Sequence, residues 1–188
     1  MKKVRFSAIV MLMCVMGWVM TGCGSDDDEP GQPTPSAKFS HVKATFGVKA
    51  EGETTQLFDV TGEWECNGDV AEMASLKQNP DQSFSPADSR KLPSAYSLTL
   101  RVSPNKSFVP EEGRKYAAKL RFTYDIVVVG SNGEELYEKE GSEYVMNMTG
   151  VHTDKLEQIA ERFPVTYLFT VKQTSGGNYE IVSDLKDD

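Results

Sequence analysis

The stretch from Tyr116 to Met148 most constrains the fold, because two β patterns face each other across a short glycine-rich segment. Its first arm alternates apolar and polar side chains up to Val128, and this period of two predicts a strand that is buried on one face only. The connection reads Gly-Ser-Asn-Gly, in which Asn132-Gly133 suits the two positive φ angles of a type I′ turn. We therefore expect a central antiparallel hairpin.

The register of this hairpin requires one irregularity. Counted back from a two-residue loop, the apolar residues of the second arm would face water. One extra residue near Glu140-Gly141 would turn them inward, and glycine tolerates the backbone of a β-bulge. We predict such a bulge, or a turn longer than the sequence suggests. The residues that it would turn inward are Tyr144, Met146 and Met148, beside Phe122, Leu120 and Ala118.

Similar alternation predicts further strands elsewhere, whereas Thr153 to Arg162 has the apolar spacing of a short helix that ends before Pro164. Residues 67–94 are rich in Asn, Pro, Asp and Ser, so we expect a long loop there with at most one helical turn. About seven strands with one crossover helix suit an immunoglobulin-like antiparallel β-sandwich. The expected strands cover residues 38–50, 58–66, 96–102, 116–128, 134–148, 165–171 and 179–181, with Gly62 as a candidate bulge and 184–188 as a solvated tail.

A second architecture follows from Gly62-Glu63-Trp64, which resembles the Gly-x-Trp opening of lipocalins. That resemblance implies a lipocalin-like β-barrel. However, a full strand precedes the motif, and too few strands follow it to close an eight-stranded barrel. We keep the barrel as the alternative fold.

The N-terminus predicts export and lipidation. Basic residues precede an apolar run from Ala8 to Met20 that is short for a membrane span and ends at Thr21-Gly22-Cys23. This ending resembles the lipobox of bacterial lipoproteins, which implies that Cys23 is lipidated and becomes the first mature residue. We therefore assign residues 1–22 to a signal peptide, 23–36 to an acidic and proline-rich tether, and 37–188 to a single β-rich domain.

The residues after Cys23 predict the destination of the protein. Ser25 is followed by the acidic run Asp26, Asp27 and Asp28, which resembles the serine-plus-acidic export signal of Bacteroidota surface lipoproteins. The resemblance implies a lipid-anchored protein of the outer membrane that faces the cell exterior. An acidic run is also typical of a solvated tether, which is the alternative interpretation.

Charge bears on the partners of the protein. Cleavage after residue 22 removes three basic residues and no acidic ones, so 17 basic residues remain against 28 acidic ones and the net charge changes from −8 to −11. No cluster of Lys and Arg remains to neutralise a polyphosphate. We therefore expect the membrane, through the lipid, as a partner, with a glycan or protein as a further candidate and no nucleic acid.

Residue chemistry points away from catalysis. Cys66 is the one cysteine left besides the lipidated Cys23, and its strand parity predicts a buried apolar thiol rather than a nucleophile. His41 and His152 lack second ligands at metal spacing, and no phosphate loop, nucleotide fingerprint or nucleophile elbow occurs. We therefore expect no catalytic, metal or cofactor site. An acid/base hydrolase that uses two carboxylates is the alternative.

The aromatic residues limit the choice of function. Most of them take the inward strand parity, so a platform for sugar stacking would have to be built in loops. We expect a non-catalytic binding or assembly domain. The alternatives are a glycan- or small-ligand-binding module of a surface uptake system, and a fimbrial or adhesin-type subunit or anchor, which resembles this chain in architecture alone. The inward aromatics are Phe46, Phe58, Trp64, Tyr96, Phe122, Tyr124, Tyr167 and Phe169, and those free to face solvent are Phe39, Phe84, Phe108 and Tyr137.

Overall fold

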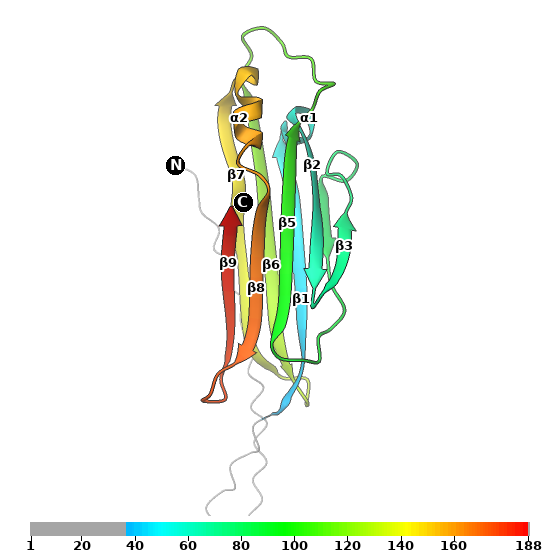
Figure 1. Cartoon of the computed structure of the whole chain (residues 1–188), viewed down its shortest axis with the longest axis vertical. Coiled ribbons are helices and arrows are strands. Elements are labelled where there is room, and N and C mark those ends of the chain that lie inside the picture. The colour runs from blue at the N-terminus through cyan, green and yellow to red at the C-terminus, as the bar shows by residue number, and fades with distance from the viewer. Residues whose placement is uncertain (1–36, 188) are drawn as a thin grey trace, which may run out of the picture. The chain divides into compact units, whose positions relative to one another are not determined.

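The computed structural model describes residues 37–187, which form an all-β sandwich of two antiparallel sheets (Figure 1). The strand orders are β4-β1-β6-β7 and β3-β2-β5-β8-β9. The predicted antiparallel sandwich is confirmed, with nine strands in the described residues where about seven were expected. The strands are β1 (Phe39–Gly52), β2 (Phe58–Cys66), β3 (Asp69–Met73), β4 (Asp81–Phe84), β5 (Ser94–Pro104), β6 (Tyr116–Gly130), β7 (Glu135–Val151), β8 (Val165–Gln173) and β9 (Tyr179–Asp187).

The two sheets do not close on each other. Each has two edge strands, β4 and β7 in the first sheet and β3 and β9 in the second. The lipocalin-like barrel is therefore not the fold of the described residues. Gly62, which suggested that fold, lies in a regular ladder with β5, in which residues 58 to 66 pair with 104 to 96 without a shift, so the bulge expected there is also absent.

The helical segments are short. α1 (Thr54–Leu57) links β1 to β2, and the predicted helix from Thr153 is a 3₁₀ turn, η1 (Thr153–Lys155), followed by α2 (Leu156–Ala160). This segment joins β7 of the first sheet to β8 of the second, so the predicted crossover is confirmed although α2 ends two residues early. Pro164 has no amide hydrogen for another helical turn.

Residues 67–94 contain two edge strands where a loop was expected. β3 pairs with β2, and β4 pairs with β1. The isolated bridge between Val42 and Ser89 then binds the rest of the segment to β1 through hydrogen bonds of 2.7 and 2.9 Å. The prediction of a long loop was wrong because strands of five and four residues carry too few alternating positions to stand out among polar neighbours.

The turn of the central hairpin has three loop residues. The Gly130 amide donates to the Glu134 carbonyl at 2.7 Å, and the Gly133 amide donates to the Gly130 carbonyl at 3.0 Å. Gly133 has a φ of 82°, whereas Asn132 is not among the described residues with positive φ. The predicted type I′ turn is therefore wrong. The connection is a tight turn followed by a left-handed glycine, which is the common three-residue hairpin loop.

The register of the hairpin is corrected farther along than we expected. β7 contains three extra residues relative to β6, at Leu136, Val145 and Gly150. Phe122 lies opposite Glu143, but beyond Val145 the partners of Leu120 and Ala118 are Met146 and Met148, as predicted. The bulge near Glu140-Gly141 and the inward orientation of Tyr144 are both wrong, because the shift comes one residue after Tyr144, which pairs with Arg121 instead.

The core lies between the two sheets and is rich in aromatic rings. The ring of Phe46 lies 5.5 to 6.3 Å from four other rings, contributed by β2, β5, β6 and β8. Four of the aromatic residues predicted to face inward are buried in one cluster together with Leu100, which confirms their inward parity. They are Trp64, Phe122, Tyr167 and Phe169.

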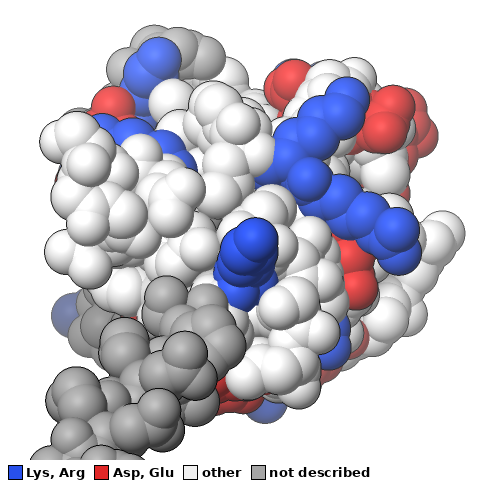
Figure 2. All heavy atoms as spheres, turned by 90° about the horizontal axis from the view of Figure 1, so that it is seen from below, with Lys and Arg blue, Asp and Glu red and all other residues white. Residues whose placement is uncertain are grey.

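The described chain enters the sandwich at the end that carries the β6–β7 and β8–β9 turns. There the Ser131 amide donates to the Lys38 carbonyl at 2.7 Å, and the Phe39 ring lies 6.3 Å from that of Tyr179. Seen from this end, a row of Lys and Arg side chains has acidic side chains directly beside it (Figure 2). Charge on this face therefore does not single out one class of partner.

Candidate functional site

The sandwich is open along the side bounded by edge strands β7 and β9, which we call the open side. A groove of about 580 Å³ runs there between the first sheet, the end of α2 and the second sheet. Its walls come from the second half of β7, from the residues after α2, and from β8 and β9. They include Val145, Met146, Met148, Phe163, Tyr167 and Leu185.

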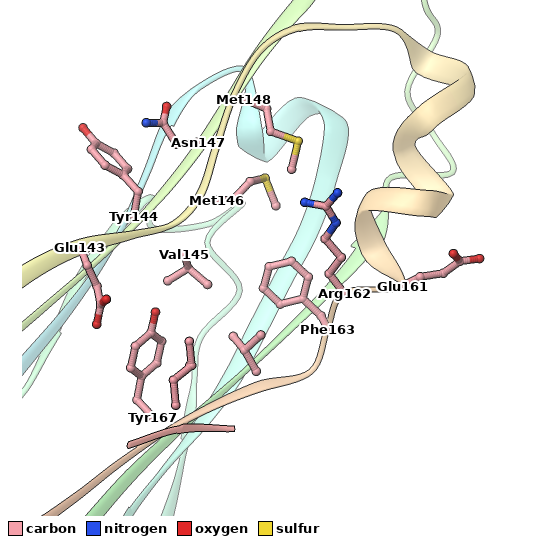
Figure 3. A pocket seen from close by; sticks show the side chains of 12 residues that line it. Glu143, Tyr144, Val145, Met146, Asn147, Met148, Glu161, Arg162, Phe163 and Tyr167 are labelled. Atoms are coloured by element: carbon pink, nitrogen blue, oxygen red, sulfur yellow. The ribbon is translucent and has the colours of Figure 1, made fainter. Parts of the chain in front are cut away.

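The bulge in β7 shapes one wall of this groove. Because Val145 is the extra residue, it and Met146 both turn toward the inside, while Tyr144 and Asn147 point away (Figure 3). Met146 is buried and Val145 is half-buried. The bulge therefore places two consecutive apolar side chains along the groove, where a regular strand would place one.

The opposite wall is apolar and partly uncovered. Leu185 has the inward parity of β9, together with the buried Ile181, yet it is 48% exposed. Phe163, after α2, is half-buried. Charged side chains stand among these apolar ones, and Arg162 reaches back toward Met146 and Met148 while Glu161 points outward (Figure 3). The groove is therefore lined by apolar and polar side chains in similar measure.

One side chain joins the two edge strands of the open side. The Lys139 Nζ of β7 donates to the Ile181 carbonyl at 3.1 Å and contacts the Ser183 hydroxyl at 3.0 Å. Lys139 therefore links β7 to β9.

Exposed large hydrophobic side chains are frequent on the two edge strands of the open side. Six such residues are exposed in the described part of the chain, and four of them lie on β7 and β9. Leu185 lines the groove, whereas Tyr144 lies on the outer face of the first sheet and Val182 has the outward parity of β9, so the four do not form one continuous patch. The four are Tyr137, Tyr144, Val182 and Leu185.

Tyr144 lies on the outer face of the first sheet, in a polar network. Arg121 donates to the Tyr144 hydroxyl, the guanidinium carbon lies 4.9 Å from the ring centroid, and Glu51 pairs with Arg121 at 3.1 Å. The hydrogen bond to Tyr144 raises the pKa of Arg121 further above its usual range. Since cations of the same chain cover the ring, it is not a free platform for a sugar.

The residues predicted as sites from the sequence, Cys23, Ser25, Asp26, Asp27 and Asp28, lie outside the described residues. The groove is built from other residues, which were not singled out as a site from the sequence. Nothing in the spacing of the groove residues marked them in advance, because they come from four separate elements. The parity of Leu185 on an edge strand was a signal, but we had assigned residues 184–188 to a solvated tail rather than to β9.

Cys66 and the histidines take structural positions. Cys66 is half-buried and the one free cysteine of the described residues, and burial raises the pKa of its thiol. His41 is half-buried in β1, where its Nε2 atom lies 3.4 Å from an Asp88 carboxylate oxygen and its Nδ1 atom lies 3.0 Å from the Ser40 hydroxyl. His152 is exposed before η1 and makes no side-chain cap there.

Residues 37–187 contain no group of three or more His, Cys, Asp or Glu side chains placed to hold a metal. Slight desolvation and then the negative charges of the neighbouring Glu135, Asp125 and Glu140 raise the pKa of Glu138. Glu138 is an exposed residue of β7 and does not line the groove. Among the helices described, none is long and apolar enough to cross a membrane.

Comparison of the chain with protein-family models, with curated proteins and with solved structures found no match.

Proposed function

We propose that this protein is a lipid-anchored domain, displayed on the outer membrane toward the cell exterior, that binds a polypeptide partner along its open side without catalysing a reaction. The anchor rests on Cys23 after its apolar run, and the display rests on Ser25 and the acidic residues 26–28. Several acyl chains hold a protein to a bilayer far more firmly than one, so lipidation would keep the domain at the membrane surface.

The open side is the single observation that carries the binding role. Two sheet edges, a groove with several apolar side chains, and the exposed side chain of Leu185 coincide there. An extended polypeptide is the occupant that uses all three features, because its backbone pairs with a sheet edge and its alternate side chains enter an apolar groove. A glycan would instead use free aromatic faces, and the Tyr144 ring is already covered by Arg121.

The binding role is tested on the full-length lipoprotein, extracted gently and separated on native gels. Leu185→Asp places a charge in the groove at a position that is 48% exposed, so the fold tolerates it while a partner does not. We expect the wild type in an assembly larger than one chain and Leu185→Asp in a smaller species. The matched control is Val70→Asp, because Val70 is 63% exposed on β3 and lies away from the groove.

If Val70→Asp and Leu185→Asp migrate like the wild type, binding through the open side is wrong. A glycan array, probed with residues 37–188, separates the alternative: a sugar signal that Leu185→Asp does not change would place the function elsewhere.

The anchor and its orientation have their own test. Cys23→Ser should leave an unprocessed precursor without lipid, and replacement of Asp26, Asp27 and Asp28 by Ala should keep the lipid but lose surface exposure. Protease added to intact cells reports exposure. Equal degradation of the triple variant and the wild type would mean that the acidic run is a spacer only.

A further inference from the structure

We infer that the polypeptide partner is a second copy of this chain, paired antiparallel along β9 with Ser183 at the twofold axis. This inference rests on the proposed binding role of the open side. It extends that role by naming the edge, the register and the partner.

Hydrogen bonds to β8 alternate along β9, and this alternation shows which backbone groups of β9 point away from β8. At the β8–β9 turn the Thr174 amide donates to the Asn178 carbonyl at 2.8 Å, so pairs two residues farther along bond in the same way. The register 172 to 180, 170 to 182 and 168 to 184 therefore uses the even-numbered backbone groups of β9 toward β8. The odd-numbered groups point to the outer edge, and the contact from Lys139 to the Ile181 carbonyl agrees with this direction.

β9 is the edge best suited to accept another strand. It pairs with β8 through nine successive residues without a shift, so its outer edge is a regular row of donors and acceptors. β7 is longer, but its three extra residues interrupt that row, and bulges are a usual protection of edges. β3 and β4 have five and four residues only. Val182 and Leu185 add exposed apolar area to β9.

The charges of β9 select one register. Pairing centred on Ser183 aligns all nine residues of β9, 179 to 187, with residues 187 to 179 of the second copy. In this register the odd-numbered backbone groups of the two strands face each other and can form hydrogen bonds. It places Glu180 opposite Lys186 of the second copy, twice by symmetry, and Ile181 opposite Leu185. The neighbouring registers are worse, because they place Glu180 opposite Asp184, or Asp184 opposite itself. Opposite charges in cross-strand pairs stabilise, and like charges destabilise.

Lys139 does not prevent this pairing. Its amine contacts the Ile181 carbonyl from β7, and a carbonyl oxygen accepts two hydrogen bonds. The second lone pair stays available for an amide of the added strand.

The test uses charge reversal on residues 37–188, which contain both complete sheets and the core. Glu180→Lys and Lys186→Glu each place like charges opposite each other in a homodimer, and each should raise the dimer Kd about tenfold or more in sedimentation velocity. The double variant Glu180→Lys/Lys186→Glu should regain the wild-type Kd. The intrachain pair of Glu180 with Lys172 at 3.2 Å is about half exposed, so its loss should affect folding little.

Mixing gives the sharpest result. An equimolar mixture of the two single variants restores both charge pairs, so it should form a heterodimer with a Kd close to that of the wild type, although each variant alone dimerises more weakly. A fold defect would not be repaired in this way. The same two variants, expressed as full-length chains with different tags, should co-purify from cells.

A backbone test is independent of charge. Ser183→Pro removes an amide that points to the outer edge, so the fold should survive and the dimer should not. Val182→Pro removes an amide bonded to β8 and should unfold the strand. A wild-type chain that is monomeric at high concentration, or a dimer that Ser183→Pro leaves intact, would overturn the inference. Loss of the native assembly in Leu185→Asp would then still support the binding role, with another partner.

Discussion

The two lateral sides of the sandwich differ in how completely side chains fill the space between the sheets. On the side of β3 and β4, which we call the closed side, the Trp64 ring stacks on Phe84 at 5.1 Å and contacts Phe46 at 5.5 Å, so aromatic side chains fill the space between the sheets. The edge strands there are short. On the open side, β7 and β9 are long, and Leu185 and Val145 leave a groove.

The closed side is also fastened by polar contacts. The amide group of Asn67 reaches the Ser89 hydroxyl at 3.1 Å, and the buried Ser94 hydroxyl donates to it at 2.9 Å. Ser89 in turn bridges to Val42 of β1. The comparison shows that side-chain packing between the sheets is complete on the closed side and incomplete on the open side, where the edge strands are long.

The largest expected effect comes from the closed side. Trp64→Ala removes a ring that is 3% exposed and contacts two others, and it should lower the free energy of unfolding by about 3 to 5 kcal/mol. Chemical denaturation of residues 37–188 measures it. Leu185→Ala, on the open side, is the matched control and should cost under about 0.5 kcal/mol. Similar losses in the two variants would mean that the sides do not differ in packing.

Substitution of two glycines, one in each sheet, should lower the free energy of unfolding by intermediate amounts and extends the comparison. A Cβ at Gly62 would lie 2.6 Å from the Thr99 carbonyl oxygen, which is backbone in a central strand. Gly62→Ala should therefore destabilise by about 1 to 3 kcal/mol, as overpacking does. A Cβ at Gly141 would overlap the ring of Tyr124, a half-buried side chain next to the open side.

Because a side chain can move where backbone cannot, Gly141→Ala should cost less than Gly62→Ala in the same measurement. The reverse order would show that Tyr124 is held as firmly as the core.

The smallest effect is expected at the link between the two edges. Lys139→Met removes the contacts with Ile181 and Ser183 and should lower the free energy of unfolding by under about 1 kcal/mol, since it is a side-chain contact near solvent. Amide hydrogen exchange in β9 should nevertheless become faster than in the wild type, whereas exchange in β2 should stay the same. Lys172→Met, which loses an exposed ion pair with Glu180, serves as the control and should leave β9 exchange nearly unchanged.

The central hairpin illustrates how much the sequence predicts. The inward parity of Phe122 and Trp64 was readable because alternation over long strands is set locally, and both residues are buried. The position of the bulge at Val145 could not be read from the sequence. The bulge leaves Tyr144 on the outer face, where Arg121 donates to its hydroxyl, and a contact between residues of two different strands cannot be read from the alternation within one strand.

The groove could not be predicted for a related reason. Its walls come from β7, the end of α2, β8 and β9, and only the crossover between sheets brings these elements together. The closed side was missed as well, since Phe84 was assigned to a loop and in fact stacks on Trp64.

The end at which the chain enters the sandwich has a mechanical consequence. The strands run along the long axis (Figure 1), and the chain enters beside Ser131 at one end of that axis. If the N-terminal segment anchors the domain as proposed, a single copy can stand with its long axis upright on the membrane. Two copies joined antiparallel at β9 would carry their first described residues at opposite ends of the shared axis, so both anchors would reach one membrane only with that axis along the surface. Pairing would therefore present a flank of the sandwich to the exterior, rather than the end that carries α1 and α2.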